Sequence, residues 1–310
     1  MVSAWACQNG VVLGQQKTDT KSNEITAIPQ LLDILELKGC IVTIDAMGCQ
    51  RDIAKKIREC EADYVLALKG NQSELQEMVS DFFTTAIQKD FSSVEHSRAE
   101  DNDYGHGRIE SRTCYAVALP TYLKEFRKEW ADLNSLICII SAREINKVMQ
   151  QETRYYISSL EANAAKISHA IRCHWHVENS LHWVLDVTFK EDDSRIRRGV
   201  AAENMSVMRH LALNLIRKEE ESKFSIPRKR RKANLYDQYR EKVLGIQTLI
   251  LLPWRHLRHD DYCYIPGAYC WFEITLQWRS YIGGHVAGAA LPTLRPSIFQ
   301  VIFCAKTSVA

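Results

Sequence analysis

Side chains that can do chemistry are most concentrated between Ile171 and Asp193. Within this stretch His174, Glu178 and His182 follow one another at intervals of four residues, which places them along one face of an α-helix. A carboxylate on a rigid, half-buried helix is a good metal ligand, because packing limits its rotamers. The alternative is an ordinary helix with a solvated Glu and two bystander histidines. A second face suits burial, because apolar residues recur at helical spacing: Val177, Leu181, Val184 and Leu185.

A second candidate is Asp45, which directly follows the run Cys40–Ile44. This short, β-branched run is typical of a strand buried on both faces. The carboxyl ends of such strands face the ligand crevice of α/β sheets, so an Asp there is placed to bind a metal or a polar ligand. Alternatively, Asp45 only caps the helix predicted over Arg51–Cys60.

Polar residues also follow the next apolar run, Asp63–Leu68, which we predict to be a second buried strand. Lys69 and Asn71 come after its end, and their donor groups suit contacts to DNA phosphates or bases. An ordinary turn before the helix predicted over Ser73–Asp81 explains the same residues.

The elements that must position these residues follow from turn and periodicity signals. Asn9-Gly10 between two apolar runs predicts a hairpin over Met1–Lys17. Helical spacing predicts helices over Ser22–Leu37 and Ala201–Arg217. Between about residue 90 and residue 165 the apolar runs are strand-like, and we predict a mostly β insertion there. From Ile246 no clear period emerges, and the stretch is either a small packed extension or sequence that does not fold with the rest.

The overall composition is that of a globular protein. The chain has 310 residues, of which 46% are hydrophobic and 25% charged. No run of about 18 apolar residues occurs, so we expect a cytoplasmic protein without membrane contact. The ten cysteines form no CxxC pair, which argues against a zinc ribbon and a disulfide framework.

The net charge of +2 conceals an uneven distribution. Residues 1–170 contain 19 Lys and Arg against 24 Asp and Glu, whereas residues 171–245 contain 16 against 11. Such a basic excess fits phosphate contacts with nucleic acid, and a solvated loop is the alternative. The excess peaks in one run, which supplies the candidate DNA contacts Arg228, Lys229, Arg230, Arg231 and Lys232.

Seven ordered motifs carry a family resemblance. They are SAWA, KSNEITAIPQLLDIL, VTIDAMGCQ, YVLALKGNQ, GHGRIESR, TRYYISSL and HWHVENSLHWVLDVTFKEDDSR. From its first residues to about Leu244, the chain resembles a DDE insertion-sequence transposase of the H-repeat-associated family, which is found with Rhs elements.

The resemblance implies an α/β fold, namely an RNase-H-like mixed sheet flanked by helices, with a β-rich insertion before the last catalytic helix. Residues 1–90 and 165–220 would form this core and residues 91–164 the insertion. Residues 221–245 would be a basic C-terminal segment, and residues 246–310 a tail without a counterpart in the family.

The same resemblance implies a catalytic site with three carboxylates that bind two divalent ions, Mg²⁺ or Mn²⁺. The second carboxylate matches Asp45 and the third matches Glu178. The family's first Asp lies on a strand upstream of the VSAWA strand, in an Asp-Gly-Lys context that this sequence lacks. We therefore expect a core whose first strand is missing, in an N-terminally truncated and impaired copy of the transposase. Its partners would be double-stranded DNA, at element ends and target, and further copies of the chain in a homo-oligomer.

Two other functions remain open. A DNA-binding remnant without catalysis would use Lys69 and the basic run 228–232. A zinc hydrolase would use His174, Glu178 and His182, since His and carboxylate are good zinc ligands. Three ligands on one straight helix rarely converge on one ion, however, because residues eight apart lie about 12 Å apart along the axis.

Overall fold

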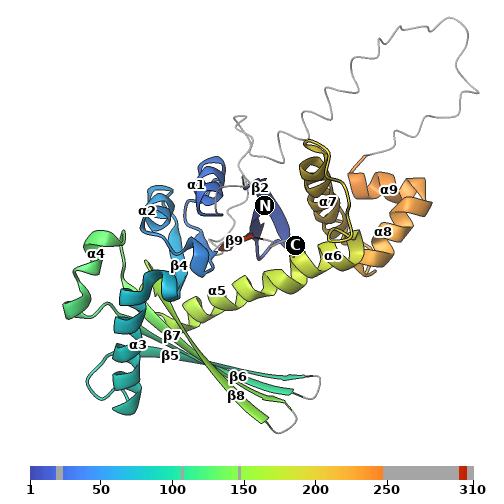
Figure 1. Ribbon diagram of the computed structural model, residues 1–310. Coiled ribbons are helices and arrows are strands. Elements are labelled where there is room, and N and C mark those ends of the chain that lie inside the picture. Colours follow the sequence, from blue (N-terminus) through green and yellow to red (C-terminus); the bar gives the residue numbers. More distant parts are fainter. Residues whose placement is uncertain (19–23, 106–107, 146–147, 247–299, 306–310) are drawn as a thin grey trace, which may run out of the picture. The chain divides into compact units, whose positions relative to one another are not determined.

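A nine-stranded mixed sheet organises the part of the chain that the computed structural model describes, residues 1–18, 24–105, 108–145, 148–246 and 300–305 (Figure 1). Its order is β2-β1-β9-β3-β4-β8-β7-β6-β5. In chain order the strands are β1 Val2–Ala6, β2 Val11–Gln16, β3 Ile41–Ile44, β4 Asp63–Leu68, β5 His96–Gly105, β6 Arg108–Ala118, β7 Ser135–Ile145, β8 Val148–Ser158 and β9 Gln300–Ala305.

The predicted hairpin is confirmed by the antiparallel pair of β1 and β2. Gly10 lies in its turn with φ +62°, a left-handed conformation that glycine adopts without a steric penalty. A bulge between Ala4 and Trp5 shifts the register, so that Trp5 is paired with Val12.

The predicted buried strand before Asp45 is also confirmed. β3 runs parallel to β9 on one side and to β4 on the other, and all four of its residues are buried. A strand covered on both faces has no solvent side, which explains its uninterrupted apolar sequence.

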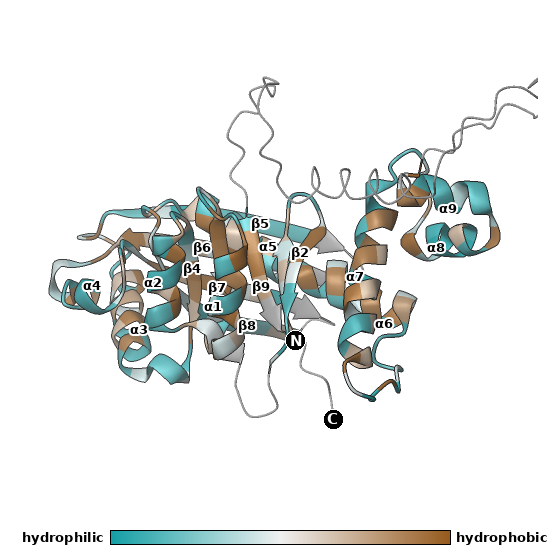
Figure 2. Cartoon of the chain, turned by 90° about the horizontal axis from the view of Figure 1, so that it is seen from above, coloured by the Kyte–Doolittle hydropathy of each residue, from teal (hydrophilic) through white to brown (hydrophobic). Residues whose placement is uncertain are grey.

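Helices cover both faces of this centre (Figures 1 and 2). One face packs against α1 (Glu24–Ile34), α2 (Arg51–Glu59) and α3 (Ser73–Gln88) in a single apolar cluster. α3 continues beyond the predicted end at Asp81. The opposite face packs against α5 (Ala164–Val177), α6 (Trp183–Phe189) and α7 (Ala201–Lys218). The result is a three-layer α/β/α arrangement.

The region after α3 forms strands β5 to β8, which pair in sequence as an antiparallel meander. The predicted β character is therefore confirmed, although β5 is polar and was not expected as a strand. β8 pairs antiparallel with β4, so the meander extends the central sheet without interruption. The short helix α4 (Phe126–Glu129) lies in the connection between β6 and β7.

The end of the described chain departs from expectation at two places. The basic run 228–232, for which no helix was predicted and a solvated loop was the alternative to phosphate contacts, is part of α8 (Ile226–Leu235), which precedes α9 (Asp237–Leu244). Gln300–Ala305, within the tail expected to lack a counterpart, forms β9 between β1 and β3. The rest of that tail, residues 247–299 and 306–310, lies outside the described residues. No described helix is long and apolar enough to cross a membrane.

Candidate active site

Asp45 lies at the carboxyl end of β3, as the sequence predicted, with its side chain exposed. Its Oδ1 accepts hydrogen bonds from the backbone N–H groups of Met47 (3.2 Å) and Gly48 (3.4 Å). Asp45 therefore caps the 3₁₀ turn Ala46–Gly48. The alternative expected for it, capping of the following helix, is wrong, because Gln50 is the N-cap residue of α2. The two capping bonds use Oδ1 alone, so the capping role and a ligand role for Oδ2 are compatible.

The turn behind Asp45 is held from the neighbouring strand end. Asn71 Nδ2 donates to the carbonyl of Ala46 at 2.7 Å, and Gln72 Nε2 donates to the carbonyl of Cys49 at 3.0 Å. Asn71, predicted to contact DNA, thus has a positioning contact to the Asp45 turn. Lys69, from the same strand end, is exposed.

Glu178 reaches the site on the long helix that crosses the sheet. The N-cap residue of α5 is Asn163, whose side chain accepts a hydrogen bond from the Lys166 N–H at 3.0 Å. After Val177 the helix widens into one π-helical turn, Glu178–His182, before α6 continues it. Such π turns are rare and occur frequently at functional sites. Glu178 itself is exposed, with its Oε2 3.2 Å from Nδ1 of the buried His182.

His174 ties the helix to the strand that carries Asp45. Its Nδ1 lies 3.2 Å from Oγ1 of Thr43 in β3. Burial lowers the pKa of His174 below its ordinary value, while the charges of Asp45 and Glu178 oppose this shift. The contact with Thr43 anchors the helix that precedes Glu178 to the strand that ends at Asp45.

The geometry of the described residues does not support the zinc alternative. Among the described residues no three His, Cys, Asp or Glu side chains form a group that could hold a metal ion. The physical reason is local: His174 is engaged with Thr43, and the π turn alters the straight helical spacing on which the prediction depended. Asp45 and Glu178 still offer the carboxylate oxygens that Mg²⁺ and Mn²⁺ prefer, although these two alone do not make a complete coordination shell.

Strand β9 contributes position 304 to the edge where Asp45 lies. Phe303 is the register partner of Ile44, so position 304 stands alongside Asp45 on the parallel neighbour. None of the residues Gln300–Ala305 has a carboxylate. The strand that lies next to β3 thus adds no acidic ligand within its described length.

Two exposed tryptophans flank Glu178. Trp175 is 46% exposed and Trp183 is 57% exposed, which is unusual for large aromatic side chains. The guanidinium carbon of Arg154, in β8, lies 4.4 Å from the ring centroid of Trp175. Sequence reasoning missed Arg154, since no local pattern connects it to a residue 21 positions later.

The basic run does not present a uniform surface. Arg228 and Arg231 are exposed, but Lys229 is only 7% exposed and its Nζ lies 3.3 Å from Glu219 Oε2. Arg230 bonds to the carbonyl of Thr188, and Lys232 lies over the ring of Tyr239. The internal contacts of Lys229 leave it out of a DNA surface, in contrast to its prediction.

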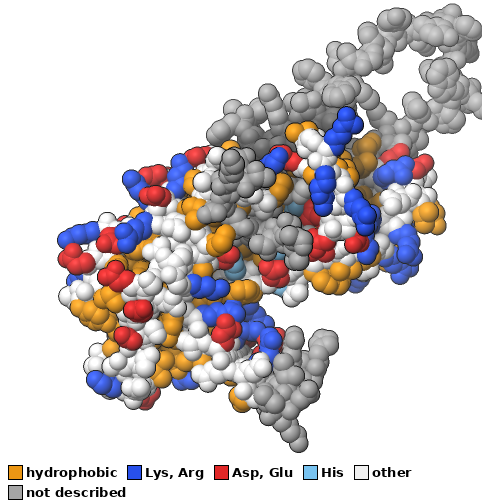
Figure 3. Space-filling model, in the orientation of Figure 1, with side chains coloured by type: hydrophobic (Ala, Val, Ile, Leu, Met, Phe, Trp, Pro, Cys, Tyr) orange, Lys and Arg blue, Asp and Glu red, His pale blue; other side chains and the backbone are white. Residues whose placement is uncertain are grey.

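Further basic residues were missed by the sequence analysis. The segment between α6 and α7 contains Arg195, Arg197 and Arg198, all exposed. Lys and Arg side chains gather on the face formed by α7, α8 and α9 (Figure 3). Three closely spaced arginines shortly after the Glu178 helix could have predicted this basic surface from the sequence.

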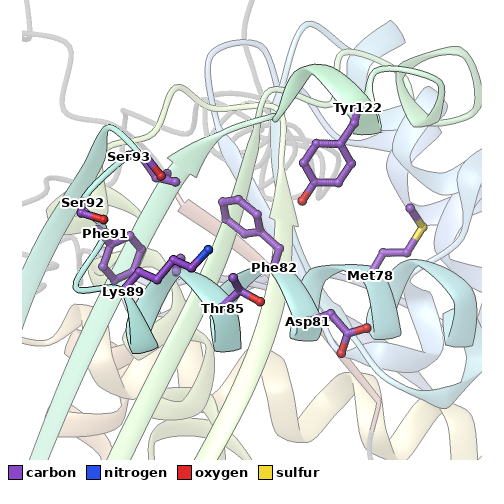
Figure 4. Close-up of a pocket in the computed structure, with 11 residues that line it drawn as sticks. Met78, Asp81, Phe82, Thr85, Lys89, Phe91, Ser92, Ser93 and Tyr122 are labelled. Carbon is purple, nitrogen blue, oxygen red and sulfur yellow. The ribbon is translucent and has the colours of Figure 1, made fainter.

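One cavity lies apart from these residues. It has a volume of about 370 Å³ and is lined by α3, the turn that follows it and Tyr122 (Figure 4). None of the candidate site residues lines it.

The chain has a mixed sheet flanked by helices. One acidic residue follows its central parallel strand, and another lies on the helix that crosses the sheet. This arrangement fits the RNase-H-like fold of DDE transposases. A family model described as "Transposase DDE domain" matches residues 1–215. The chain therefore belongs to the DDE transposase family.

Individual relatives agree with this assignment. Over 248 residues the chain is 47% identical to "Putative transposase YncI" of Escherichia coli O157:H7, covering 79% of this chain and 63% of that protein. It is 44% identical over 249 residues to "H repeat-associated putative transposase YhhI" of Escherichia coli strain K12, covering 79% of this chain and 65% of the relative. The chain thus spans less than two thirds of the length of these relatives.

Proposed function

We propose that the chain is a DNA transposase of the DDE type, which cleaves and transfers DNA strands with divalent metal ions. The observation that carries this proposal is the 3.2 Å contact between His174 Nδ1 and Thr43 Oγ1. It joins the helix that precedes Glu178 to the strand that ends at Asp45, although the two carboxylates are 133 positions apart in sequence (178 − 45). The family membership supplies the reaction type.

The chemistry requires oxygen ligands at this place. Two Mg²⁺ or Mn²⁺ ions, when bound, supply activation of the attacking water or 3′-hydroxyl and stabilisation of the leaving oxygen. Asp45 would offer Oδ2, because Oδ1 is engaged with the turn. Glu178 would offer its carboxylate from a helix fixed by the contact of His174 with Thr43.

We further propose that catalysis by this chain is impaired. The family resemblance calls for a third carboxylate on a strand next to these two, and β9, the described strand on that side of β3, has none. Loss of one ligand misplaces the ions, and the position of the ions determines the rate. Binding to DNA does not depend on that ligand, which keeps a non-catalytic DNA-binding function as the second candidate.

The proposed DNA surface consists of Lys69, Arg228 and Arg231, together with the exposed arginines 195, 197 and 198. Such charges neutralise phosphates and release counterions, which gives affinity without sequence information. We also propose that copies of the chain form a homo-oligomer on DNA. This part of the proposal is supported only by membership of the DDE transposase family.

The test is a strand-cleavage assay on DNA that carries the element's own ends, with Mg²⁺ or Mn²⁺. It compares the chain with Asp45→Asn, Glu178→Gln and the matched control Asp193→Asn, whose exposed carboxylate lies 3.7 Å from Lys190. We expect weak cleavage that both site variants abolish and the control retains.

Three outcomes separate the candidates. Cleavage that survives Asp45→Asn and Glu178→Gln contradicts the assigned site. A second version of the chain is extended upstream with a strand that carries an Asp. If neither version cleaves DNA but both bind it in a salt-dependent way, the non-catalytic DNA-binding function is favoured. Absence of both binding and cleavage contradicts both candidates.

A further inference from the structure

Strand β9 fills a defined place in the sheet. Five of its residues pair antiparallel with β1, from Val301 with Ala6 to Ala305 with Val2. Four residues pair parallel with β3, from Gln300 with Ile41 to Phe303 with Ile44. β1 and β3 have no direct pairing in the sheet order, so β9 is the link between the β1–β2 hairpin and the remaining strands.

Burial shows that both faces of β9 pack against apolar side chains. Val301 and Phe303 belong to the cluster with α1 and α2, whereas Ile302 belongs to the cluster with α6 and α7. Their exposed fractions are 3%, 1% and 0%. A slip of one residue would exchange these faces, so the alternation specifies one register.

A polar contact at the first position reinforces this register. The side chain of Gln300 is 4% exposed and its Nε2 donates to the carbonyl of Ala170 in α5. Its own carbonyl accepts from the N–H of Cys7 at 3.2 Å. Buried polar groups are costly unless hydrogen-bonded, so a slipped strand would leave Gln300 without these partners.

We propose that the space between β1 and β3 is a strand-acceptor site, and that its ligand is the chain's own segment Gln300–Ala305, bound as an extended peptide. The segment is separated from the end of α9 by positions 245 to 299. Because the segment belongs to the same chain as β1 and β3, its binding is intramolecular and takes place at a high effective concentration. Main-chain bonds give such strand addition its affinity, and the side-chain alternation gives its specificity.

This site does not depend on the proposed catalysis. It accounts for the folding of the β1–β2 hairpin onto the sheet, since two strands alone are marginally stable in water. The site also makes the strand beside Asp45 exchangeable, because the strand that occupies the site supplies the residue that stands alongside Asp45.

The experiment uses the full chain with a protease recognition sequence introduced between residues 247 and 299. The folded chain is cut, and the nicked protein is examined by gel filtration and by hydrogen exchange. We expect the two pieces to elute together and the amides of β1, β3 and β9 to stay protected. Separation of the pieces with undiminished protection of β1 and β3 would overturn the proposal.

A peptide competition then tests the site itself. The nicked chain is unfolded in urea and refolded with an excess of a fluorescent peptide that spans residues 298–306. We expect the peptide to be incorporated in place of the C-terminal piece, and a peptide with Ile302→Asp to be excluded at least 10-fold. In the uncut chain the tethered strand should reduce incorporation by a similar factor. No incorporation, or equal incorporation of both peptides, would contradict a specific acceptor site.

Discussion

At the scale of single residues, the position of Asp45 depends on a glycine three residues later. A Cβ added to Gly48 would lie 2.2 Å from Cγ2 of Ile44. Gly48 also donates its N–H to Asp45 Oδ1. The close approach therefore couples the packing of the strand to the orientation of the carboxylate.

We predict that Gly48→Ala destabilises the protein by about 1–3 kcal/mol, because overpacking forces the turn away from Ile44. Urea unfolding of the full chain measures this change. The matched control is Gly70→Ala, since a Cβ there meets no atom within 4 Å. Equal effects of the two substitutions would show that contact with Ile44 is not the cause.

A second residue-scale prediction concerns Glu219, whose side chain is 2% exposed. Burial alone would raise its pKa, but hydrogen bonds from Ser222, Tyr239 and Lys229 prevail and lower the pKa to about 2 from an ordinary 4.5. The stabilisation is therefore present above about pH 4.5 and is lost as the pH falls towards 2.

Glu219→Gln should cost about 3–5 kcal/mol at pH 7, because it leaves the Lys229 ammonium buried without its counter-ion. Urea unfolding at pH 7 and at pH 2.5 measures this cost, and the difference from the native protein should shrink at the lower pH. Glu221→Gln is the control, because Glu221 is 78% exposed and surface ion pairs contribute little. A cost independent of pH would refute the assignment to the carboxylate.

At the scale of elements, the site depends on the helix that carries His174 and Glu178. The first turn of α5 is capped by Asn163, whose side chain accepts the N–H of Lys166. Asn163→Ala should destabilise the protein by about 1 kcal/mol, and Asn163→Asp should retain most of the stability because Asp also caps. Urea unfolding decides between them, and a loss of the same size in both variants would contradict the capping role.

The sequence was sufficient for elements whose pattern is local. The Asn9-Gly10 hairpin, the buried strand before Asp45 and the helix that begins the 171–193 stretch all follow from turn chemistry or periodicity. The bounds of the buried strand also predicted that Asp45 lies at its carboxyl end. The polar strand β5 was missed because it has no alternating apolar face, and its pairing with β6 decides its conformation.

What the sequence did not predict depends on contacts between distant residues. The π turn at Glu178 is invisible to a helical pattern that assumes constant spacing. Lys229 was grouped with its basic neighbours, although its burial follows from Glu219 on another element. Strand β9 was missed since only pairing with β1 and β3, nearly 300 and 260 positions away, gives Gln300–Ala305 its structure.

At the scale of the whole molecule, the exposed and buried members of the basic run should differ in their effect on DNA binding. Arg228→Gln and Arg231→Gln should each reduce the slope of log affinity against log salt by about 0.9, the value for one lost phosphate contact. Lys229→Gln should leave that slope unchanged while lowering stability. Fluorescence anisotropy at several salt concentrations measures the slopes, and equal slopes for all three variants would exclude α8 from the DNA surface.

The sheet also predicts where a third metal ligand can be supplied. Position 304 stands alongside Asp45, because Phe303 pairs with Ile44 in the parallel register. If Asp45 and Glu178 bind the metal ions as proposed, a carboxylate introduced at this backbone position would add a further hard oxygen ligand. Cys304→Asp should therefore tighten Mn²⁺ binding by about 10-fold, equivalent to about 1.4 kcal/mol, as measured by isothermal titration calorimetry of the full chain.

Two control variants separate coordination from a general charge effect. Cys304→Asn has nearly the shape of Asp without its charge, so it should leave Mn²⁺ affinity unchanged. Asp45→Asn combined with Cys304→Asp should lose the gain, because coordination by the new carboxylate requires its neighbour. If the variants with Asp and with Asn at position 304 bind Mn²⁺ equally, β9 does not place this position at the proposed metal site.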